Sequence, residues 1–261
     1  NLKLIAFERT PFQELEIYFG IIDKIKKFIM KLLIGFFYKK FDLIICNSKL
    51  ICKYLEKKYK ISSIAIFPPA IKKIEKNRKN YKNNIDTRVI TVCRLSKEKN
   101  LYEMINSIKE INDKKLSLKI IGDGPERKKL TNYIKNLKTQ NQIKLIGHKD
   151  NPYEFLKNSD LYINSSYFEG FPNSVVEAVN AGVPVIASQS YGGINDILLN
   201  GKGGVIYIGN YITLRDKIVH FINNKNIYFK KVKNARKNLK RFSLVNHVNQ
   251  FEKEINKIYK L

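Results

Sequence analysis

Two glutamates, Glu169 and Glu177, stand in a stretch whose residue types could bind an oxygen-rich ligand. The stretch reads Glu-Gly-Phe-Pro-Asn-Ser-Val-Val-Glu and comes after the apolar run Leu161–Asn164. A glycine and a proline interrupt the chain, and Ser174 is a residue type that begins helices. The first amides of a helix lack partners within it and, with the helix dipole, attract phosphate or sugar oxygens. Carboxylates on either side would accept hydrogen bonds from hydroxyl groups.

The same residues also have a purely structural interpretation. Ser174 and Glu177 are spaced as in a capping box, in which each side chain bonds to a backbone amide at the start of a helix. This interpretation accounts for Glu177 and not for Glu169, for which the sequence indicates no structural partner. We therefore expect the carboxylate of Glu169 to be available to a ligand.

Cations that could balance these carboxylates follow another apolar run, Val89–Cys93. Arg94 and Lys99 lie in Arg-Leu-Ser-Lys-Glu-Lys directly after it. A single surface cation says little in a chain with 49 Lys and Arg residues, so the position after a strand is what distinguishes this pair. Together they could neutralise a bound diphosphate.

Short apolar runs alternate with segments of helical pattern, which predicts a parallel sheet with helices on both faces. A ligand crevice is then expected at the carboxyl ends of the strands. We expect Asn100 to cap a helix through Ile111, with Glu103 as its capping-box partner, and another helix to begin at Pro125. The expected strands are Val89–Cys93, Leu116–Ile121, Ile143–Ile146, Leu161–Asn164, Pro184–Ala187 and Val205–Ile208.

The chain before this repeat also alternates, and it begins as if a strand were already under way. We expect strands at Leu43–Cys46 and Ile64–Phe67, with a helix between them that begins after Asn47-Ser48 and continues to Tyr59. Segment 20–40 has a basic and apolar helical pattern. Segment 244–261 has apolar residues three or four apart, which predicts an amphipathic helix.

Taken together, the motifs resemble those of the GT4-type retaining glycosyltransferases (glycosyltransferase group 1), which have the GT-B fold. The resemblance covers about residues 40–261. The residues that carry it are Cys93-Arg94-Leu95 with Lys99-Asn100, Gly122-Asp123-Gly124-Pro125, Glu169 and Glu177, and Gly182-Val183-Pro184-Val185-Ile186-Ala187.

The resemblance implies an α/β fold with a complete C-terminal Rossmann-like domain and a partial N-terminal one. The N-terminal, acceptor-side domain would span residues 1–72, a linker 73–87 and the nucleotide-sugar-binding domain 88–243, and a helix at 244–261 would cross back to the N-terminal domain. In the family, the N-terminal domain begins with a strand and a glycine-rich loop that this sequence does not show. We therefore expect the start of that domain to be missing.

The resemblance also implies roles for individual residues, without a metal or cofactor. Arg94 and Lys99 would hold the diphosphate, Glu177 would bind the ribose hydroxyls, and Glu169 would bind the donor sugar. The backbone from Phe171 through Pro172 and Asn173 to Ser174 would contribute amides to the sugar site, Gly122 and Gly124 would let the nucleotide approach, and the turn at Gly147 and His148 would border the base. The expected catalytic residues are Glu169, Arg94 and Lys99.

The implied reaction moves a sugar, with retention, from a UDP- or GDP-sugar to a glycan or lipid-linked acceptor, in surface-polysaccharide or glycan assembly. No carboxylate nucleophile is evident, so positive charge on the leaving diphosphate would supply the catalysis. Two alternatives stay open. One is a GT-B nucleotide-sugar epimerase, which would need an acid–base pair that the sequence does not reveal. The other is a truncated, non-catalytic chain that binds nucleotide-sugar.

The chain has a net charge of +26. This charge favours polyanionic partners such as anionic membranes and phosphate-bearing substrates, or it reflects a general compositional bias of the chain toward Lys, Asn and Ile. Nucleic acid is not expected, because no helix-turn-helix, zinc spacing or aromatic-interleaved strand is present. Segment 20–40 could lie on the anionic cytoplasmic face of a membrane, or it could be an ordinary helix packed on a sheet. Three cysteines without Cys-x-x-Cys spacing favour a reducing compartment, and we expect a cytoplasmic protein.

Overall fold

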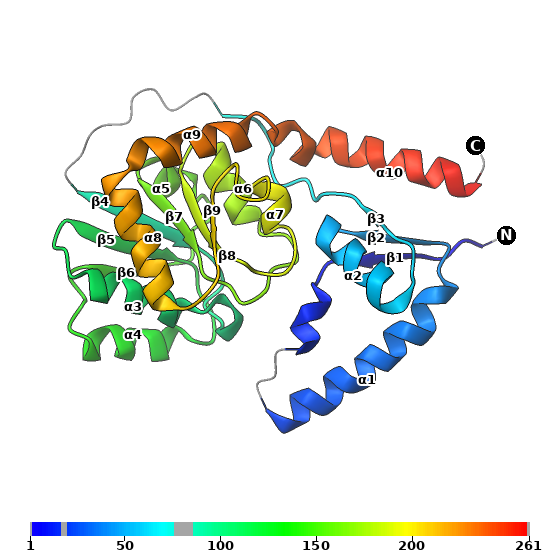
Figure 1. The fold of residues 1–261 in the computed structure, drawn as a ribbon, viewed down its shortest axis with the longest axis horizontal. Helices are drawn as coiled ribbons and strands as arrows, with labels where there is room; N and C mark the ends of the chain where they lie inside the picture. The colour runs from blue at the N-terminus through cyan, green and yellow to red at the C-terminus, as the bar shows by residue number, and fades with distance from the viewer. Residues whose placement is uncertain (1, 17–19, 76–85, 260–261) are drawn as a thin grey trace.

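The computed structural model describes residues 2–16, 20–75 and 86–259, which form two lobes, each built on a parallel sheet (Figure 1). The small lobe contains β1 (Ile5–Glu8), β2 (Leu43–Cys46), β3 (Ile64–Ala65), α1 (Ile21–Phe37) and α2 (Lys49–Tyr59). The large lobe contains β4 (Thr87–Val92), β5 (Leu116–Ile121), β6 (Ile143–Gly147), β7 (Leu161–Asn164), β8 (Val185–Ser188) and β9 (Val205–Tyr207). Its helices are α3 (Leu101–Ile111), α4 (Arg127–Asn136), α5 (Tyr153–Lys157), α6 (Asn173–Asn180), α7 (Ile194–Ile197), α8 (Tyr211–Asn223) and α9 (Lys225–Arg236).

The large sheet has the order β6-β5-β4-β7-β8-β9 with every pairing parallel. Helices cover both of its faces, so alternate side chains of one strand enter different cores. In β7, Tyr162 packs with α5, α6, α7 and α9, whereas Leu161 and Ile163 pack with α3, α4 and α8. The predicted α/β class, with one larger parallel sheet and a smaller partial one, is confirmed. The strand order reverses between β4 and β7, and open α/β sheets bind ligands at such a switch point.

Several predicted element ends are shifted in the structure. The helix expected to begin at Pro125 begins at Arg127, because the preceding residues form a turn. Asn100 precedes α3 in a left-handed conformation with φ of 49°, and its side chain bonds to the carboxylate of Glu103 instead of capping a backbone amide. By contrast, α2 has the predicted bounds, since it begins after Ser48 and ends at Tyr59, and the Ser48 hydroxyl caps it by accepting the amide of Ile51 at 3.3 Å.

The structure describes the two ends of the segment that joins the lobes. Asn180 of α6 accepts the amide of Glu75 at 3.0 Å and donates to the carbonyl of Lys73 at 3.0 Å. Residues 76–85, the middle of the predicted linker, lie outside the described residues. Thr87, which the linker was expected to include, is already the first residue of β4.

After α9, a short 3-10 turn (Leu239–Phe242) leads to α10 (Leu244–Tyr259), which runs from the large lobe along the small lobe (Figure 1). The ring of Phe251 stacks on the ring of Phe7 in β1 with 5.9 Å between the ring centroids. The Nδ1 atom of His247 lies 2.9 Å from the carbonyl oxygen of Phe67. The helix is amphipathic in sequence, but none of its described residues is fully buried.

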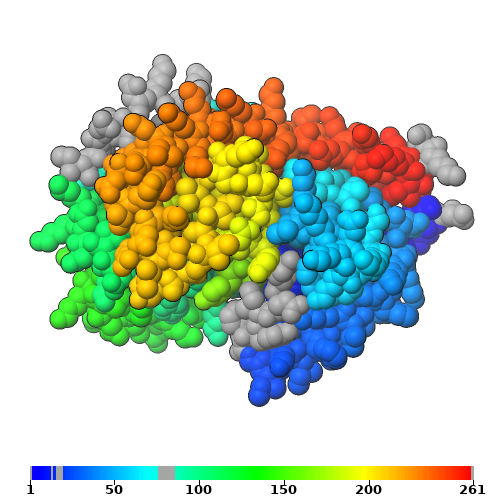
Figure 2. Space-filling model, in the orientation of Figure 1, coloured from blue at the N-terminus to red at the C-terminus, as the bar shows by residue number. Residues whose placement is uncertain are grey.

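The two lobes also touch directly. The amide of Lys49 at the start of α2 donates to the carboxylate of Asp196 in α7 at 3.0 Å. Figure 2 shows the cyan surface of α2 against the yellow surface around α7. A second contact is so close that a Cβ atom on Gly170 would lie 1.7 Å from the carbonyl oxygen of Arg9. Glycine is therefore required where the large lobe meets the end of β1.

Candidate functional site

The segments that follow β4 and β7 lie side by side at the switch point of the large sheet. The two strands pair through Val89 with Leu161 and Ile90 with Tyr162. Beyond the strands, the hydroxyl of Ser165 donates to the carbonyl oxygen of Lys99 at 2.9 Å. The sheet therefore brings the segment that carries Lys99 next to the segment that leads to Glu169.

Glu169 lies in a network of hydrogen bonds, contrary to the expectation that it had no structural partner. The ammonium group of Lys99 lies 2.9 Å and 3.0 Å from its two carboxylate oxygens. The hydroxyl of Ser166 and the side-chain amide of Asn164 donate to the Oε1 atom at 2.6 Å and 3.2 Å. Only 11% of the Glu169 side chain and 18% of the Lys99 side chain are exposed. Charge and hydrogen bonds thus fix this carboxylate in position.

The Arg94 side chain has no counterion in the described part of the structure. It is exposed and has no hydrogen-bond or ion-pair partner among the described residues. The carbonyl of Arg94 accepts the amide of Ser96 at 3.0 Å, which folds the backbone into a tight turn. The guanidinium group is therefore available to an anion.

Gly122 and Gly124 support this turn from the next strand. A Cβ atom on Gly122 would lie 1.8 Å from the carbonyl oxygen of Cys93, and one on Gly124 would lie 2.5 Å from that of Leu95. The amide of Leu95 also donates to the carbonyl of Asp123 at 2.9 Å. The close approach seen in the structure is therefore to the backbone on either side of Arg94, and contact of these glycines with a nucleotide stays a prediction.

The start of α6 differs from a capping box, so that interpretation of Glu177 was wrong. The helix begins at Asn173 after Pro172, and the hydroxyl of Ser174 accepts the buried Tyr162 hydroxyl at 2.8 Å. The amides of Asn173 and Ser174 have no acceptor within the described part of the chain. They form an open helix N-terminus next to Glu169, as an anion or sugar oxygen would require.

Phe171 and Pro172, from the segment predicted to contribute amides to the sugar site, differ in what they can offer a ligand. Pro172 has no N–H group and is buried, so it cannot donate to a ligand. The ring of Phe171 packs against Phe67 and Phe242 at centroid distances of 5.9 Å and 5.3 Å, so its side chain belongs to the core. Of the two, only the amide of Phe171 could face a ligand.

Glu177 is partly buried in α6, and burial raises the pKa of its carboxyl above the usual value. No hydrogen bond or ion pair to this carboxylate occurs among the residues that the structure describes. A partly buried carboxylate without a donor is unfavourable, and ligand hydroxyl groups would relieve this cost.

His148 lies at the margin of the site. Its side chain is 74% exposed, and its Nε2 atom lies 3.3 Å from the Asp150 carboxylate. The preceding Gly147 is closer to the other site residues, because its carbonyl accepts the amide of Gly122 at 2.9 Å. Within the described residues, no three His, Cys, Asp or Glu side chains are grouped so that they could hold a metal ion.

Sequence reasoning missed the residues that hold the Glu169 segment in place. Besides Asn164 and Ser166, these include the turn at Gly192 and Gly193. A Cβ atom on Gly192 would lie 1.7 Å from the carbonyl oxygen of Glu169. The amide of Gly193 donates to the carbonyl oxygen of Gly170 at 2.9 Å. Two adjacent glycines shortly after the expected strand Pro184–Ala187 are the signal that could have indicated this turn.

The site combines an unpaired cation, a fixed ion pair and an open helix N-terminus at the switch point of the sheet. These groups suit a ligand that contains both phosphate and hydroxyl groups. The family model "Glycosyl transferases group 1" matches residues 72–241. The chain belongs to this family. The resemblance to the GT4 family and its GT-B fold is thereby confirmed.

This group 1 glycosyltransferase chain is similar to two known proteins in sequence and to a third in structure. An uncharacterized glycosyltransferase of Methanocaldococcus jannaschii is 32% identical over 67% of this chain and 48% of its own length. The poly(glycerol-phosphate) alpha-glucosyltransferase of Bacillus subtilis is 28% identical over 66% of this chain and 26% of its own length. The structure of Anabaena HepE with UDP and glucose matches 98% of this chain and 72% of its own, with a TM-score of 0.77 and 20% identity. The chain spans about half the length of its first curated relatives.

Proposed function

We propose that the protein transfers a sugar, with retention, from a UDP- or GDP-sugar to a glycan or lipid-linked acceptor in the assembly of surface polysaccharide or another glycan. The observation that carries this proposal is the position of Arg94 and the Lys99–Glu169 pair beside the open start of α6. The relatives support it, because one is named for glucosyl transfer to poly(glycerol phosphate) and another is described with UDP and glucose.

In the proposed reaction, the bond between the sugar anomeric carbon and the diphosphate breaks as the acceptor oxygen bonds to the same carbon. The acceptor proton passes to the departing phosphate oxygen, and both events take place on one face of the sugar, which preserves its configuration. Arg94, Lys99 and the amides of Asn173 and Ser174 stabilise the negative charge on the leaving diphosphate. Glu169 accepts hydrogen bonds from the sugar, and Glu177 accepts them from the ribose.

Calorimetry with UDP, GDP and their sugars, together with a transfer assay, tests this proposal. We expect Glu177→Ala to weaken nucleotide binding and Glu169→Ala mainly to lower transfer. Failure of the wild-type chain to bind any of these nucleotides would contradict the donor site, as would unchanged affinity and rate in both variants. Binding without transfer would instead favour a non-catalytic, nucleotide-sugar-binding chain.

We also propose that segment 20–40 contacts an anionic membrane. Among the described residues of α1, Ile34 is the only buried apolar one, and large apolar side chains are exposed along most of the helix. Those at least 49% exposed are Ile21, Ile22, Ile25, Phe28, Ile29, Met30, Leu32, Leu33 and Phe36. Lys26, Lys39 and Lys40 are among the cations beside them. Apolar side chains flanked by lysines suit the interface of an anionic bilayer. Among the described helices, none is long and apolar enough to cross a membrane.

Sedimentation with vesicles tests this contact. We expect the protein to bind phosphatidylglycerol vesicles at low salt and to bind neutral phosphatidylcholine vesicles far less. Phe28→Ser with Leu32→Ser should abolish binding, whereas Lys128→Ser on α4, an exposed residue of the other lobe, should leave it unchanged. Equal binding by all variants, or self-association of the wild type through this face without vesicle binding, would contradict a membrane role.

A further inference from the structure

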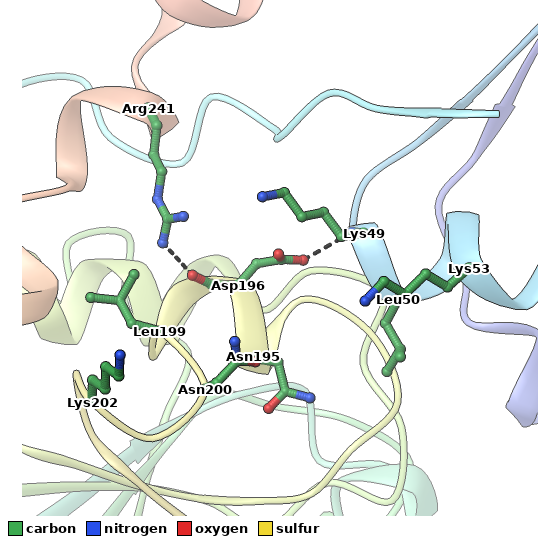
Figure 3. Close-up of a pocket in the computed structure, with 9 residues that line it drawn as sticks. All are labelled: Lys49, Leu50, Lys53, Asn195, Asp196, Leu199, Asn200, Lys202 and Arg241. Atoms are coloured by element: carbon green, nitrogen blue, oxygen red, sulfur yellow. Dashed lines mark hydrogen bonds between the residues drawn. The ribbon is translucent and has the colours of Figure 1, made fainter.

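A polar cavity lies at the junction of the two lobes, apart from the Arg94–Glu169 site. It encloses about 430 Å³ between α2 of the small lobe and α7 with its following turn in the large lobe (Figure 3). None of the residues that line it belongs to the group around Glu169. A volume of this size falls in the range of small-molecule sites, which is about 300–1,000 Å³.

Positive charge dominates the lining of this cavity, which we call the junction pocket. Lys49 and Lys53 come from α2, Lys202 from the turn after α7, and Arg241 from the 3-10 turn before α10. Asp196 is the only acidic residue among the described residues that line the pocket. Lys49, Lys53 and Lys202 form no ion pair with a carboxylate in the described part of the chain. The lining therefore has four cations and one carboxylate, which leaves an excess of positive charge.

Asp196 supplies one negative charge near four cations, and its carboxylate already accepts a hydrogen bond from the protein. Its carboxylate accepts the amide of Lys49 at 3.0 Å, and its main-chain carbonyl accepts the Arg241 guanidinium. Burial raises the pKa of Asp196, although Lys49 and Arg241 act in the opposite direction. The Nε atom of Arg241 is buried without a hydrogen-bond partner among the described residues. Figure 3 shows the side chains of Arg241 and Lys202 on one side of α7 and those of Lys49 and Lys53 on the other.

Lysines are common in this chain, so their number alone would not mark a site. The neighbouring cavity around the end of α2 also contains Lys53, Lys57 and Lys60, but these come from one helix and its end, and Glu56 accompanies them. In the junction pocket, by contrast, three separate segments of both lobes contribute cations. The side-chain amides of Asn195 and Asn200 add uncharged donors.

We propose that the junction pocket binds a ligand that carries phosphate or sulfate groups, and that this ligand contacts both lobes at once. Lysine and arginine side chains with nearby amide donors form strong, charge-assisted hydrogen bonds to such oxygens. The groups belong either to a small phosphorylated molecule or to a phosphate-bearing chain, and the pocket chemistry is the same for both.

Calorimetry with inorganic pyrophosphate, at constant ionic strength, tests the junction pocket. Because the donor site would also attract pyrophosphate, binding is measured in an Arg94→Ala background. We expect Lys53→Glu with Lys202→Glu to weaken this binding by about tenfold or more. The matched control, Lys57→Glu with Lys128→Glu, changes the net charge equally at exposed positions outside the pocket and should leave the affinity within about twofold.

Equal losses in the two double variants would show a general charge effect and overturn the proposal, as would absence of pyrophosphate binding in the Arg94→Ala background. A second series distinguishes the source of the groups by comparing pyrophosphate with a poly(glycerol phosphate) chain. A polymeric ligand is supported if poly(glycerol phosphate) binds more tightly than pyrophosphate and its affinity falls to that of pyrophosphate in the Lys53→Glu, Lys202→Glu variant. Pyrophosphate binding with no gain for the chain supports a small one.

Discussion

The ammonium nitrogen of Lys99 lies 2.9 Å and 3.0 Å from the two carboxylate oxygens of Glu169, and both side chains are largely buried. The two residues follow different strands, β4 and β7, at the reversal of strand order. Without a ligand, each neutralises the other. A bound diphosphate would share Lys99 with Glu169, so the pair couples the phosphate side of the proposed donor site to its sugar side.

A double-mutant cycle measures this coupling. We expect Lys99→Ala and Glu169→Ala each to lower the free energy of unfolding by about 1–3 kcal/mol, because the remaining partner stays poorly solvated. The coupling energy should be about 1–3 kcal/mol. Urea unfolding followed by circular dichroism provides the values. The exposed pair Lys157–Glu154 is the control, with an expected coupling of about 0.5 kcal/mol. Equal coupling in the two pairs would contradict a special role for the buried one.

Arg94 should behave in the opposite way, because its side chain has no partner to lose among the described residues. We expect Arg94→Ala to change the free energy of unfolding by less than about 0.5 kcal/mol. Transfer should fall by about 10²–10³-fold, the range for loss of one donor to developing negative charge. Arg94→Lys should recover part of the rate, since an ammonium keeps the charge but not the paired N–H groups. Full activity of Arg94→Ala would remove it from the site.

The strands could be predicted from the sequence because the large sheet is buried on both faces. Central parallel strands of this kind are almost continuous apolar runs, and Leu116–Ile121 and Leu161–Asn164 have the bounds that were expected. Helix starts were less predictable. Ser174 has the right residue type for a cap, but the Tyr162 hydroxyl occupies it, and α6 begins at Asn173 directly after Pro172.

The partners of Glu169 could not have been found from local sequence. Lys99 is 70 positions away, and the two residues meet only because β4 pairs with β7 and not with β6. The alternation of strands and helices does not specify that order. Position at a strand end was enough to select Arg94, Lys99 and Glu169, but their separate states, one cation unpaired and one paired, depend on tertiary packing.

Glu177 should make stability depend on pH. Burial raises the pKa of its carboxyl in the folded protein above 4.5, so the folded state binds more protons than the unfolded state between the two pKa values. Stability from this group is therefore lost as the pH rises through that window. We expect Glu177→Gln to increase stability at pH 7 and to lose this advantage below about pH 4.5, as measured by urea unfolding across that range. Nucleotide affinity should fall in the same variant. A stability gain that does not change with pH would show that the charge is not its cause.

Gly170→Ala tests the contact between the lobes. A Cβ atom here would lie 1.7 Å from the carbonyl oxygen of Arg9 and 2.9 Å from the Nδ2 atom of Asn47, and a backbone carbonyl cannot rotate away as a side chain can. We expect the lobes to shift apart and the free energy of unfolding to fall by about 1–3 kcal/mol. Donor affinity should fall as well, because Gly170 follows Glu169.

The matched control for this substitution is Gly35→Ala in α1, where a Cβ atom would lie 3.4 Å from the Tyr59 ring, an ordinary contact distance. Alanine in a helix interior should increase stability by about 0.5–1 kcal/mol. Thermal unfolding by circular dichroism and calorimetry with UDP compare the two variants. If Gly170→Ala were as stable as Gly35→Ala and bound UDP equally well, the packing of the Glu169 segment against Arg9 would have no part in holding the site.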